Sequence, residues 1–534
     1  MNRKLLVAPA AIGLAIPLLA GCGSGSGSGG DGKPIVVGTT DQFQMSKDNP
    51  APLDPATGYD IGTWNVFENT YQTLLRLPRS GTDPEPEAAK ECHFTDSLGE
   101  QYRCTMRDGL TFSNGDKITS EDVKFSVDRM LRINDPNGPA GLMTNVDRVE
   151  TPDPSTVVFH LKDPDSTFPF KLSTPAADIV DSKVYSATKV HTGFGVVGSG
   201  PYTLASWDPG KRAVFTRNSR YKGSIKLQNS KIELRFFTTS AAMESALKAG
   251  TIDVMNRTMT PDQINRLIVG GDGSVKLTEA PGTEIRYLVF NTADKTAAQK
   301  AVRQAVAELV DRQSITRDVY QRTTEPLYSM VPQGITGHSN PFFDIYGDQP
   351  DRARAKQYLK DAKISTPVPL TLSYTTTHYG EATAAEFAKL KQELESSGLF
   401  KVSLNPVADW QAYKASYRAR KFQVFGMGWF PDFPDPDNYL APFFGVDNFL
   451  KLAYQNPTIR DQIIKDTRQK TERSGAVGDF QQAQRLIAQD VPILPLWQGK
   501  QYIAARNNIT GTEWALNASS TTQFWELGRG VATS

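Results

Sequence analysis

Two of the three cysteines in this 534-residue sequence are spaced so that oxidation could join them. Cys92 and Cys104 stand in the segment ECHFTDSLGEQYRCTM, which is typical of a strand, a turn at residues 96–99 and a returning strand. A hairpin centred near Leu98 places the two cysteines opposite each other, within disulfide range. We therefore expect a Cys92–Cys104 disulfide, which an oxidising compartment favours. Two buried free thiols are the alternative.

The third cysteine, Cys22, stands where a thiol could be joined to lipid. Residues 1–21 have a short basic start and an apolar stretch below the roughly 20 residues that span a membrane, which is typical of a secretory signal peptide. The segment LAGC, residues 19–22, resembles the bacterial lipobox, in which the thiol receives a diacylglycerol. Residues 22–33 then form a Gly/Ser tether, and we expect an extracytoplasmic protein that is lipid-anchored to the outer face of the bacterial cytoplasmic membrane. An ordinary export signal with an incidental cysteine is the alternative.

Other residue types with catalytic or metal-binding chemistry are not spaced for it. The five histidines include no pair at the i, i+4 spacing of a helical metal site. The segment SATK, residues 186–189, has the Ser-x-x-Lys spacing of penicillin-recognising enzymes but no Lys-Thr-Gly partner, and no P-loop is present. A net charge of +1 offers no basic field to nucleic acid. We expect no catalytic residue, no metal, no cofactor and no nucleic-acid partner.

The rest of the sequence alternates between short strands and amphipathic helices. In ITSEDVKFSVDRMLRINDP, Thr119 and Asp122 fit a capping box, and Asn134 follows the last apolar turn. In SAAMESALKAGTIDVM, Ser240 is expected to cap a helix that Gly250 ends. Further helices are predicted at residues 298–309, 355–362, 387–394 and 410–417, and strands at residues 401–405, 422–429 and 491–497. The pattern predicts an α/β fold of mixed sheets covered by helices, in two or three lobes.

Several longer segments together resemble one protein family. They are MRDGLTFSNGDKITSEDVKFSVDRM, GSGPYTLASWDPGKRAVFTRNSRYKG, ALKAGTIDV, YLVFNT with AVRQAVAELVDRQSI, GWFPDFPDPDNYL and DVPILPLW. In this order they resemble the family 5 extracellular solute-binding proteins, which include oligopeptide-, dipeptide- and nickel-binding components of ABC importers. The resemblance covers nearly all of residues 34–534.

The resemblance implies a two-lobed α/β fold of the periplasmic-binding-protein type (type II, cluster C), with an extra subdomain on the first lobe. Lobe I would comprise residues 34–64, 199–281 and 497–534, its subdomain residues 65–198, and lobe II residues 282–496. Two chain crossings between the lobes make a natural hinge, so the lobes can close on a ligand.

The same resemblance implies a monomeric binding protein rather than an enzyme. The protein would capture a peptide ligand between its lobes and deliver it to the permease subunits of an ABC importer, whose ATPases supply the energy. Ligand would touch both lobes only in the closed form and would shift the equilibrium toward that form. The membrane would be contacted through the lipid anchor only.

The ligand-loop segment GWFPDFPDPDN holds the residues to which the resemblance assigns binding. Its match to the dipeptide-binding pattern Gly-Trp-x-x-Asp-x-x-Asp-Pro-Asp-Asn aligns Asp432 with the aspartate that pairs with the peptide's α-ammonium group, and Trp429 with the neighbouring tryptophan. A buried ammonium needs a charged partner to offset its desolvation. The alternative for Asp432 is a turn made with the intervening prolines, which is the role we expect for Asp435 and Asp437. Trp429 fits ligand contact or core packing equally.

Three aromatic residues near the edges of these motifs, Tyr59, Trp64 and Trp497, are candidates for the pocket lining, with plain packing as the alternative. No basic residue can be assigned to a peptide carboxylate. Other functions also remain open: a non-peptide ligand such as a nickel chelate, an opine or an oligosaccharide in the same fold, or a peptide-sensing surface receptor. An extracytoplasmic hydrolase is disfavoured because no nucleophile and base share a recognisable pattern.

Overall fold

A computed structural model of the protein describes residues 32–43, 45, 50–79, 81–270, 273–446, 448 and 450–530. The expected signal peptide over residues 1–21, the expected lipidation site Cys22 and most of the Gly/Ser tether lie outside the described residues. Within the described part of the chain, no helix is both long and apolar enough to cross a membrane.

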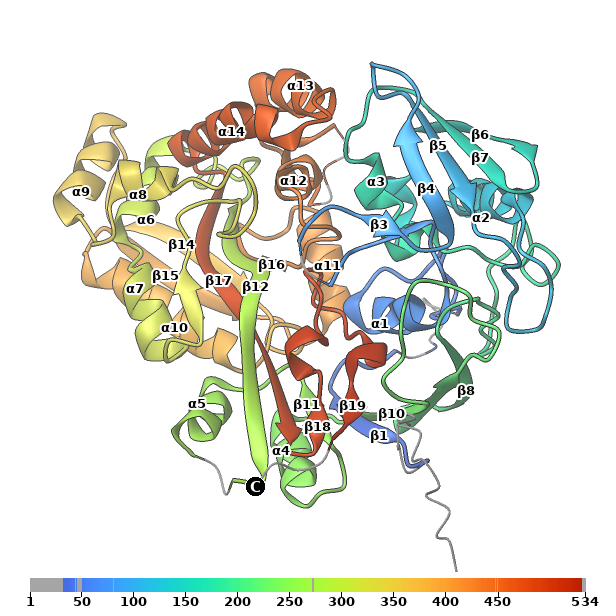
Figure 1. The fold of residues 1–534 in the computed structure, drawn as a ribbon. Coiled ribbons are helices and arrows are strands. Elements are labelled where there is room, and N and C mark those ends of the chain that lie inside the picture. Colours follow the sequence, from blue (N-terminus) through green and yellow to red (C-terminus); the bar gives the residue numbers. More distant parts are fainter. Residues whose placement is uncertain are drawn as a thin grey trace, which may run out of the picture.

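One mixed sheet runs through both lobes of the molecule (Figure 1). Among the described residues it has eleven strands in the order β15-β14-β16-β12-β17-β11-β1-β10-β9-β8, and β13 pairs with β17 off this path. Their bounds are β1 (Ile35–Thr39), β8 (Tyr202–Asp208), β9 (Arg212–Arg217), β10 (Lys231–Phe236), β11 (Val254–Asn256), β12 (Val275–Phe290), β13 (Thr324–Pro326), β14 (Val368–Tyr374), β15 (Phe400–Pro406), β16 (Val424–Trp429) and β17 (Ile493–Arg506). The long strands β12 and β17 are antiparallel partners and connect its two ends.

Two hydrophobic cores lie along this sheet and define two lobes. The core of lobe I draws on residues 35–71, 180–254 and 503–527, and the core of lobe II draws on residues 285–497. Between the two cores, the pairing of β12 with β17 shifts register from Pro281 to Ile285. Such a bulge bends the strand and increases its twist. A Cβ on Gly282 would lie 2.4 Å from the carbonyl oxygen of Gly499, so glycine allows the two strands to approach closely here.

Helices cover both lobes. In lobe I they are α1 (Ile61–Thr70), α4 (Ser240–Lys248) and α5 (Pro261–Gly270). In lobe II they are α6 (Lys300–Leu309), α7 (Arg312–Ser314), α8 (Pro341–Tyr346), α9 (Arg352–Asp361), α10 (Ala382–Ser396), α11 (Trp410–Arg418), α12 (Ala441–Phe444), α13 (Ile464–Arg468) and α14 (Val477–Asp490). The expectation that Ser240 caps α4 is wrong, because the hydroxyl of Thr239 accepts the hydrogen bond from Ala242 N.

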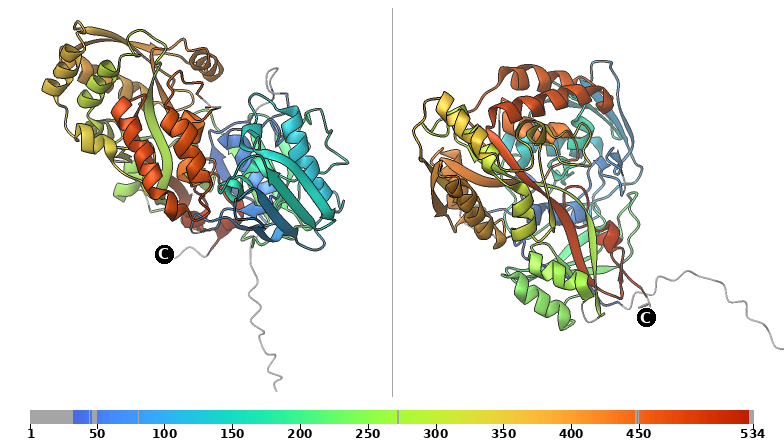
Figure 2. Two further views of the ribbon diagram at one scale, coloured as in Figure 1. Left: turned by 90° about the horizontal axis from the view of Figure 1, so that it is seen from above. Right: turned by 90° about the vertical axis from the view of Figure 1, so that its left-hand side faces the viewer.

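A subdomain with its own core stands beside lobe II when the molecule is seen from above (Figure 2). Its sheet has the order β4-β5-β7-β6, formed by β4 (Ala89–Phe94), β5 (Gln101–Met106), β6 (Val146–Asp153) and β7 (Thr156–Leu161). Helices α2 (Ser120–Ile133) and α3 (Phe168–Lys171) belong to it, and α2 begins at the expected Thr119–Asp122 capping box and ends at Asn134. Two short ribbons, β2 (Leu75–Arg76) with β3 (Glu85–Pro86) and β18 (Ile509–Thr510) with β19 (Gly528–Arg529), complete the strands.

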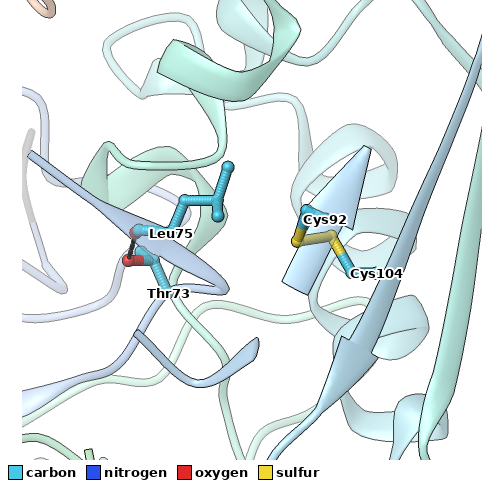
Figure 3. The surroundings of a disulfide bond; sticks show 4 residues. All are labelled: Thr73, Leu75, Cys92 and Cys104. Atoms are coloured by element: carbon cyan, nitrogen blue, oxygen red, sulfur yellow. Dashed lines mark hydrogen bonds between the residues drawn. A yellow bond between two sulfur atoms is a disulfide. The ribbon is translucent and has the colours of Figure 1, made fainter. Parts of the chain in front are cut away.

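The subdomain hairpin holds the disulfide. Cys92 on β4 and Cys104 on β5 are directly opposed in the strand register, with their Cα atoms 4.1 Å apart, and their sulfur atoms are bonded (Figure 3). The turn between the strands is held by Asp96, whose Oδ1 accepts hydrogen bonds from the backbone N–H groups of Leu98, Gly99 and Glu100. This hairpin is the one that the spacing of the two cysteines predicts.

Candidate functional site

The loop that follows β16, residues 430–440, lies where lobe II meets lobe I, and we call it the ligand loop after its motif. Strand β16 ends at Trp429, and the loop ends in a short helical turn, η4 (Pro436–Tyr439), before α12 begins. Three carboxylates lie in this loop, and the side chains of Asp432, Asp435 and Asp437 are all buried. Because buried carboxylates need hydrogen bonds or charged partners, the partners of each one indicate what it does.

Asp432 takes its hydrogen-bond donors from both lobes. The hydroxyl of Tyr59 in lobe I donates to Asp432 Oδ2 over 3.0 Å, and Asn438 Nδ2 donates to the same oxygen over 3.0 Å. The hydroxyl of Ser519, also in lobe I, donates to the Asp432 carbonyl oxygen over 3.0 Å. The Asp432 side chain therefore stands at the junction of the lobes.

No basic side chain among the described residues forms an ion pair with Asp432, although only 6% of its surface is exposed. Burial raises the pKa of the Asp432 carboxyl to about 6, while the hydrogen bonds from Asn438 and Tyr59 hold the pKa down. Desolvation disfavours the ionised form of a carboxyl unless an opposite charge lies near it. Asp432 is thus a buried carboxylate whose ionised form would be stabilised by a cation.

Trp429 and Asn438 hold the two ends of the loop together. Trp429 Nε1 donates to Asn438 Oδ1 over 3.1 Å, and the Asp432 N–H donates to the same oxygen over 2.8 Å. The Trp429 ring packs against Phe443, with ring centroids 5.2 Å apart, and the residue is 8% exposed. Through Asn438, Trp429 fixes the position of the Asp432 side chain.

Asp435 and Asp437 do form the turn that the prolines suggest, since Asp435 Oδ1 accepts from Asp437 N over 2.8 Å at the start of η4. Each carboxylate also receives two hydrogen bonds from one arginine. Arg473 binds Asp435 over 2.7 Å and 2.7 Å, and Arg468 binds Asp437 over 3.0 Å and 3.0 Å. Bidentate pairing of this kind is strong and directional. Nothing local in the sequence indicates these partners, which lie more than thirty residues away.

The three aromatic candidates have different surroundings. Tyr59 is half-buried and reaches Asp432, as described above. Trp64 packs behind it, with ring centroids 5.3 Å apart, and donates from Nε1 to Gly58 O over 3.1 Å. Trp497 belongs to the core of lobe II, where its Nε1 donates to Glu386 Oε2 over 3.1 Å. Of the three, only Tyr59 has a polar atom bonded to Asp432 in the described structure.

No group of three or more His, Cys, Asp or Glu side chains in the described residues is arranged to hold a metal ion.

Residues 83–451 match the bacterial extracellular solute-binding proteins, family 5, over the family's middle region. The chain belongs to this family. A relative named the probable D,D-dipeptide-binding periplasmic protein DdpA of Escherichia coli K12 is 26% identical over 480 residues, covering 87% of this chain and 89% of the relative.

Two solved structures show the same fold. The murein tripeptide binding protein MppA of Escherichia coli matches with a TM-score of 0.79 at 20% identity, covering 93% of this chain and 98% of that chain. The binding protein AgaA of A. tumefaciens R10, in complex with agropinic acid, matches with a TM-score of 0.76 at 21% identity, covering 92% and 96%. This family 5 solute-binding protein thus has the two-lobed α/β fold that its motifs predict.

The candidate site of this solute-binding protein is only partly visible in its sequence. The ligand-loop motif indicates Asp432 and Trp429, and Tyr59 is indicated by its place near a motif edge. Asn438, which lies inside the quoted motif, and Ser519, which lies in no motif, are found only from their contacts with Asp432.

Proposed function

We propose that this solute-binding protein captures peptides with a free amino terminus and that Asp432 binds the peptide's α-ammonium group. The observation that carries the proposal is a buried carboxylate with hydrogen-bond donors from both lobes and no basic partner in the described residues. A ligand ammonium at Asp432 would supply the missing charge. Because the interaction is charge-assisted and shielded from water, it would be stronger than a neutral hydrogen bond.

The place of Asp432 couples binding to closure. A ligand bound at Asp432 lies beside Tyr59 and Ser519 of lobe I, so it makes its full set of contacts only when the lobes are together. Such a ligand shifts the equilibrium toward the closed form by the free energy of those extra contacts. We propose Trp429 as the residue that holds Asp432 in place through Asn438.

The names of the relatives support a peptide ligand, since DdpA is named for D,D-dipeptides and MppA for a murein tripeptide. We propose that the closed, loaded form delivers peptide to the permease subunits of an ABC importer, whose ATPases drive transport. In this role the protein acts as a monomer and is not an enzyme. No cofactor and no nucleic acid take part.

We propose the lobe boundaries given by the motifs, with lobe I formed by residues 34–64, 199–281 and 497–534, its subdomain by residues 65–198 and lobe II by residues 282–496, but with two adjustments. The whole of α1 belongs to lobe I, because Val66 and Phe67 pack in the core of that lobe, and Trp497 belongs to lobe II, because it packs in the core there. The hinge would then lie in the paired strands β12 and β17, near the register shift after Pro281. Lipidation of Cys22 would hold the protein at the outer face of the cytoplasmic membrane, with residues 22–33 as the tether. Mass spectrometry of the membrane-bound protein would detect the acyl chains.

Calorimetry with a defined peptide mixture tests the function. The purified protein is unfolded and refolded to remove carried ligand, then titrated with a mixture of di- to pentapeptides and with the same mixture after N-acetylation. We expect heat from the free-amine mixture and none from the acetylated one. Binding of both mixtures with equal affinity would remove Asp432 from amine recognition, and binding of neither would overturn the peptide proposal.

A non-peptide ligand is the second candidate, favoured by one observation. AgaA shares the fold, and its structure holds agropinic acid, which belongs to the opine class of the alternatives above. If the refolded protein binds no peptide, the same titration with opines, oligosaccharides and nickel chelates tests this candidate. Mass spectrometry of incubated peptides would also reveal any cleavage, and neighbouring genes for permease and ATPase subunits would favour import over sensing.

A further inference from the structure

The subdomain touches lobe II at the connection between α13 and α14, next to the loop that carries Asp432. Ser166, just before α3, donates from its backbone N–H to the carbonyl oxygen of Arg468 over 2.7 Å. The Ser166 hydroxyl accepts a hydrogen bond from Arg473 Nη1 over 2.8 Å. These contacts join Ser166 of the subdomain to two arginines of lobe II.

The same two arginines hold the ligand loop. Arg473 uses Nε and Nη2 for Asp435, and Nη1 for Ser166 and for the Thr467 carbonyl oxygen, at 2.8 Å and 2.6 Å. Only 12% of its side chain is exposed, so each of these donors is largely shielded from water. The planar guanidinium fixes the directions of all its hydrogen bonds at once. The position of Ser166 is therefore linked to the position of Asp435.

Two further contacts lie at this junction. Asp165, fully buried, pairs with Lys171; burial alone would raise its pKa, but Lys171 and Arg468 outweigh burial and lower the pKa to about 2. On the apolar side, the ring of Phe170 in α3 stacks on the ring of Phe433 in the ligand loop, with centroids 5.7 Å apart. The ligand loop thus contacts lobe I at Asp432 and contacts the subdomain at Phe433, the next residue.

We propose that Arg468 and Arg473 are positioning residues that bind the ligand loop to Ser166 of the subdomain. The loop that presents Asp432 then also holds the two lobes together, and we call the contacts of Ser166 with Arg468 and Arg473 the latch. The proposal deepens the proposed function, because it names the residues that set how readily the binding site closes. When the lobes separate, the Ser166 contacts must break while the arginine–aspartate pairs within lobe II stay. The latch therefore stabilises the closed form without touching ligand.

The contacts of Ser166 change the measured affinity by changing the fraction of protein in the closed form. The affinity that is measured is the affinity of the closed form reduced by the fraction of protein able to adopt it. Losing a hydrogen bond to a charged group lowers an equilibrium constant by roughly tenfold or more. Removing the Ser166 hydroxyl should consequently lower the ratio of closed to open protein by about tenfold.

The test compares Ser166→Ala with Ser173→Ala in the full protein. Ser173 is a matched control, because it is buried in the same segment but its hydroxyl donates to Phe170 O inside the subdomain. Ligand-free X-ray scattering of the refolded proteins reports the radius of gyration, and urea unfolding reports stability. We expect Ser166→Ala to have the larger radius, with Ser173→Ala like the wild type, and both variants to retain cooperative unfolding.

Affinity for trialanine and its dissociation rate provide the second measurement. The latch predicts that Ser166→Ala releases the peptide about tenfold faster, with little change in the association rate, since closure follows encounter. A scattering profile identical to wild type, or a wild type that is fully open without ligand, would overturn the proposal. A purely structural Ser166 would lower stability and leave scattering unchanged. If trialanine fails to bind but the radii differ as expected, the latch stands and the peptide proposal fails.

Discussion

The two halves of the ligand loop both bury aspartate side chains, but in the described part of the chain only the second half pairs them with arginines. Asp435 and Asp437 are each held by an arginine of their own lobe through two hydrogen bonds. Asp432, three residues before Asp435, receives only neutral donors, from Tyr59 and Asn438. The chain thus supplies cations for two of the three buried carboxylates. This difference supports our proposal that Asp432 binds a charge that comes from outside the chain.

Burial raises the pKa of both Asp432 and Asp435, but the groups that oppose this effect differ. Asp432 has its pKa raised to about 6 by burial, against the hydrogen bonds from Asn438 and Tyr59. Burial also raises the pKa of Asp435, but Arg473 opposes this and keeps a charged partner in place when Asp435 is ionised. Removing the cation from a paired buried carboxylate lowers the free energy of unfolding. A buried carboxylate without a cation lowers the free energy of unfolding of the ligand-free protein, because desolvation disfavours its ionised form.

The largest expected effect is a loss of stability when Asp435, which is paired with Arg473, is replaced. Asp435→Asn removes the charge that Arg473 faces and leaves a guanidinium largely buried without its partner. Breaking a buried ion pair in this way costs about 3 to 5 kcal/mol of unfolding free energy. Urea unfolding measures the loss. A variant as stable as the wild type would mean that the pairing does not distinguish the two halves.

Replacing Asp432 by asparagine is expected to change the free energy of unfolding in the opposite direction. Asp432→Asn removes a carboxyl group whose pKa in the folded protein is raised by burial to about 6. Near neutral pH this group is ionised, and its ionised form lowers the stability of the folded protein. We expect the unfolding free energy of the ligand-free protein to rise by about 1 to 2 kcal/mol, since the lost hydrogen bonds offset part of the gain. A loss of stability like that of Asp435→Asn would contradict the comparison.

The pH dependence of binding sharpens the comparison further. In the empty protein the Asp432 carboxyl is half protonated at about pH 6, and an ammonium group needs its ionised form. Peptide affinity should therefore be highest near pH 7 and fall by up to roughly tenfold per pH unit below pH 6. It should also fall above about pH 8, where the peptide's own α-ammonium group loses its proton. Calorimetry across this range checks the slope. Asp432→Asn should bind weakly with no inflection near pH 6, and an inflection that persists in this variant would assign the titration to another group.

The smallest effect is expected at Tyr59, which contributes one neutral hydrogen bond to Asp432. Because that hydrogen bond lowers the Asp432 pKa, Tyr59→Phe should move the inflection of the binding curve to higher pH. Affinity at neutral pH should fall by about threefold, in keeping with one hydrogen bond. Trp64→Phe, which alters the ring behind Tyr59, is the matched control and should leave the inflection in place.

Local features of this structure could be predicted because short-range rules decide them. The alternating pattern around Cys92 and Cys104 fixes a hairpin, and the Thr119–Asp122 pair fixes the start of α2. The start of α4 is less certain from sequence, because Thr238, Thr239 and Ser240 all carry a capping hydroxyl, and the backbone selects Thr239.

Long-range partners could not be predicted in this way. Arg468 and Arg473 are ordinary surface residue types in the sequence, and only folding brings them onto Asp437 and Asp435. The ligand-loop motif locates Asp432 but does not say which carboxylate lacks a cation, since that depends on residues in three separate stretches of the chain. The Ser166 contact between subdomain and lobe II likewise has no sequence signal.

A cycle of four calorimetric titrations tests the proposal that Asp432 binds the ligand's ammonium group. Wild type and Asp432→Asn are each titrated with one free-amine peptide, chosen from those that bind, and with its N-acetylated form. We predict that either change alone weakens binding by about 2 kcal/mol or more and that the second change then adds little, because both remove the same charge pair. Additive losses would mean that Asp432 and the ammonium act independently, and would contradict the account.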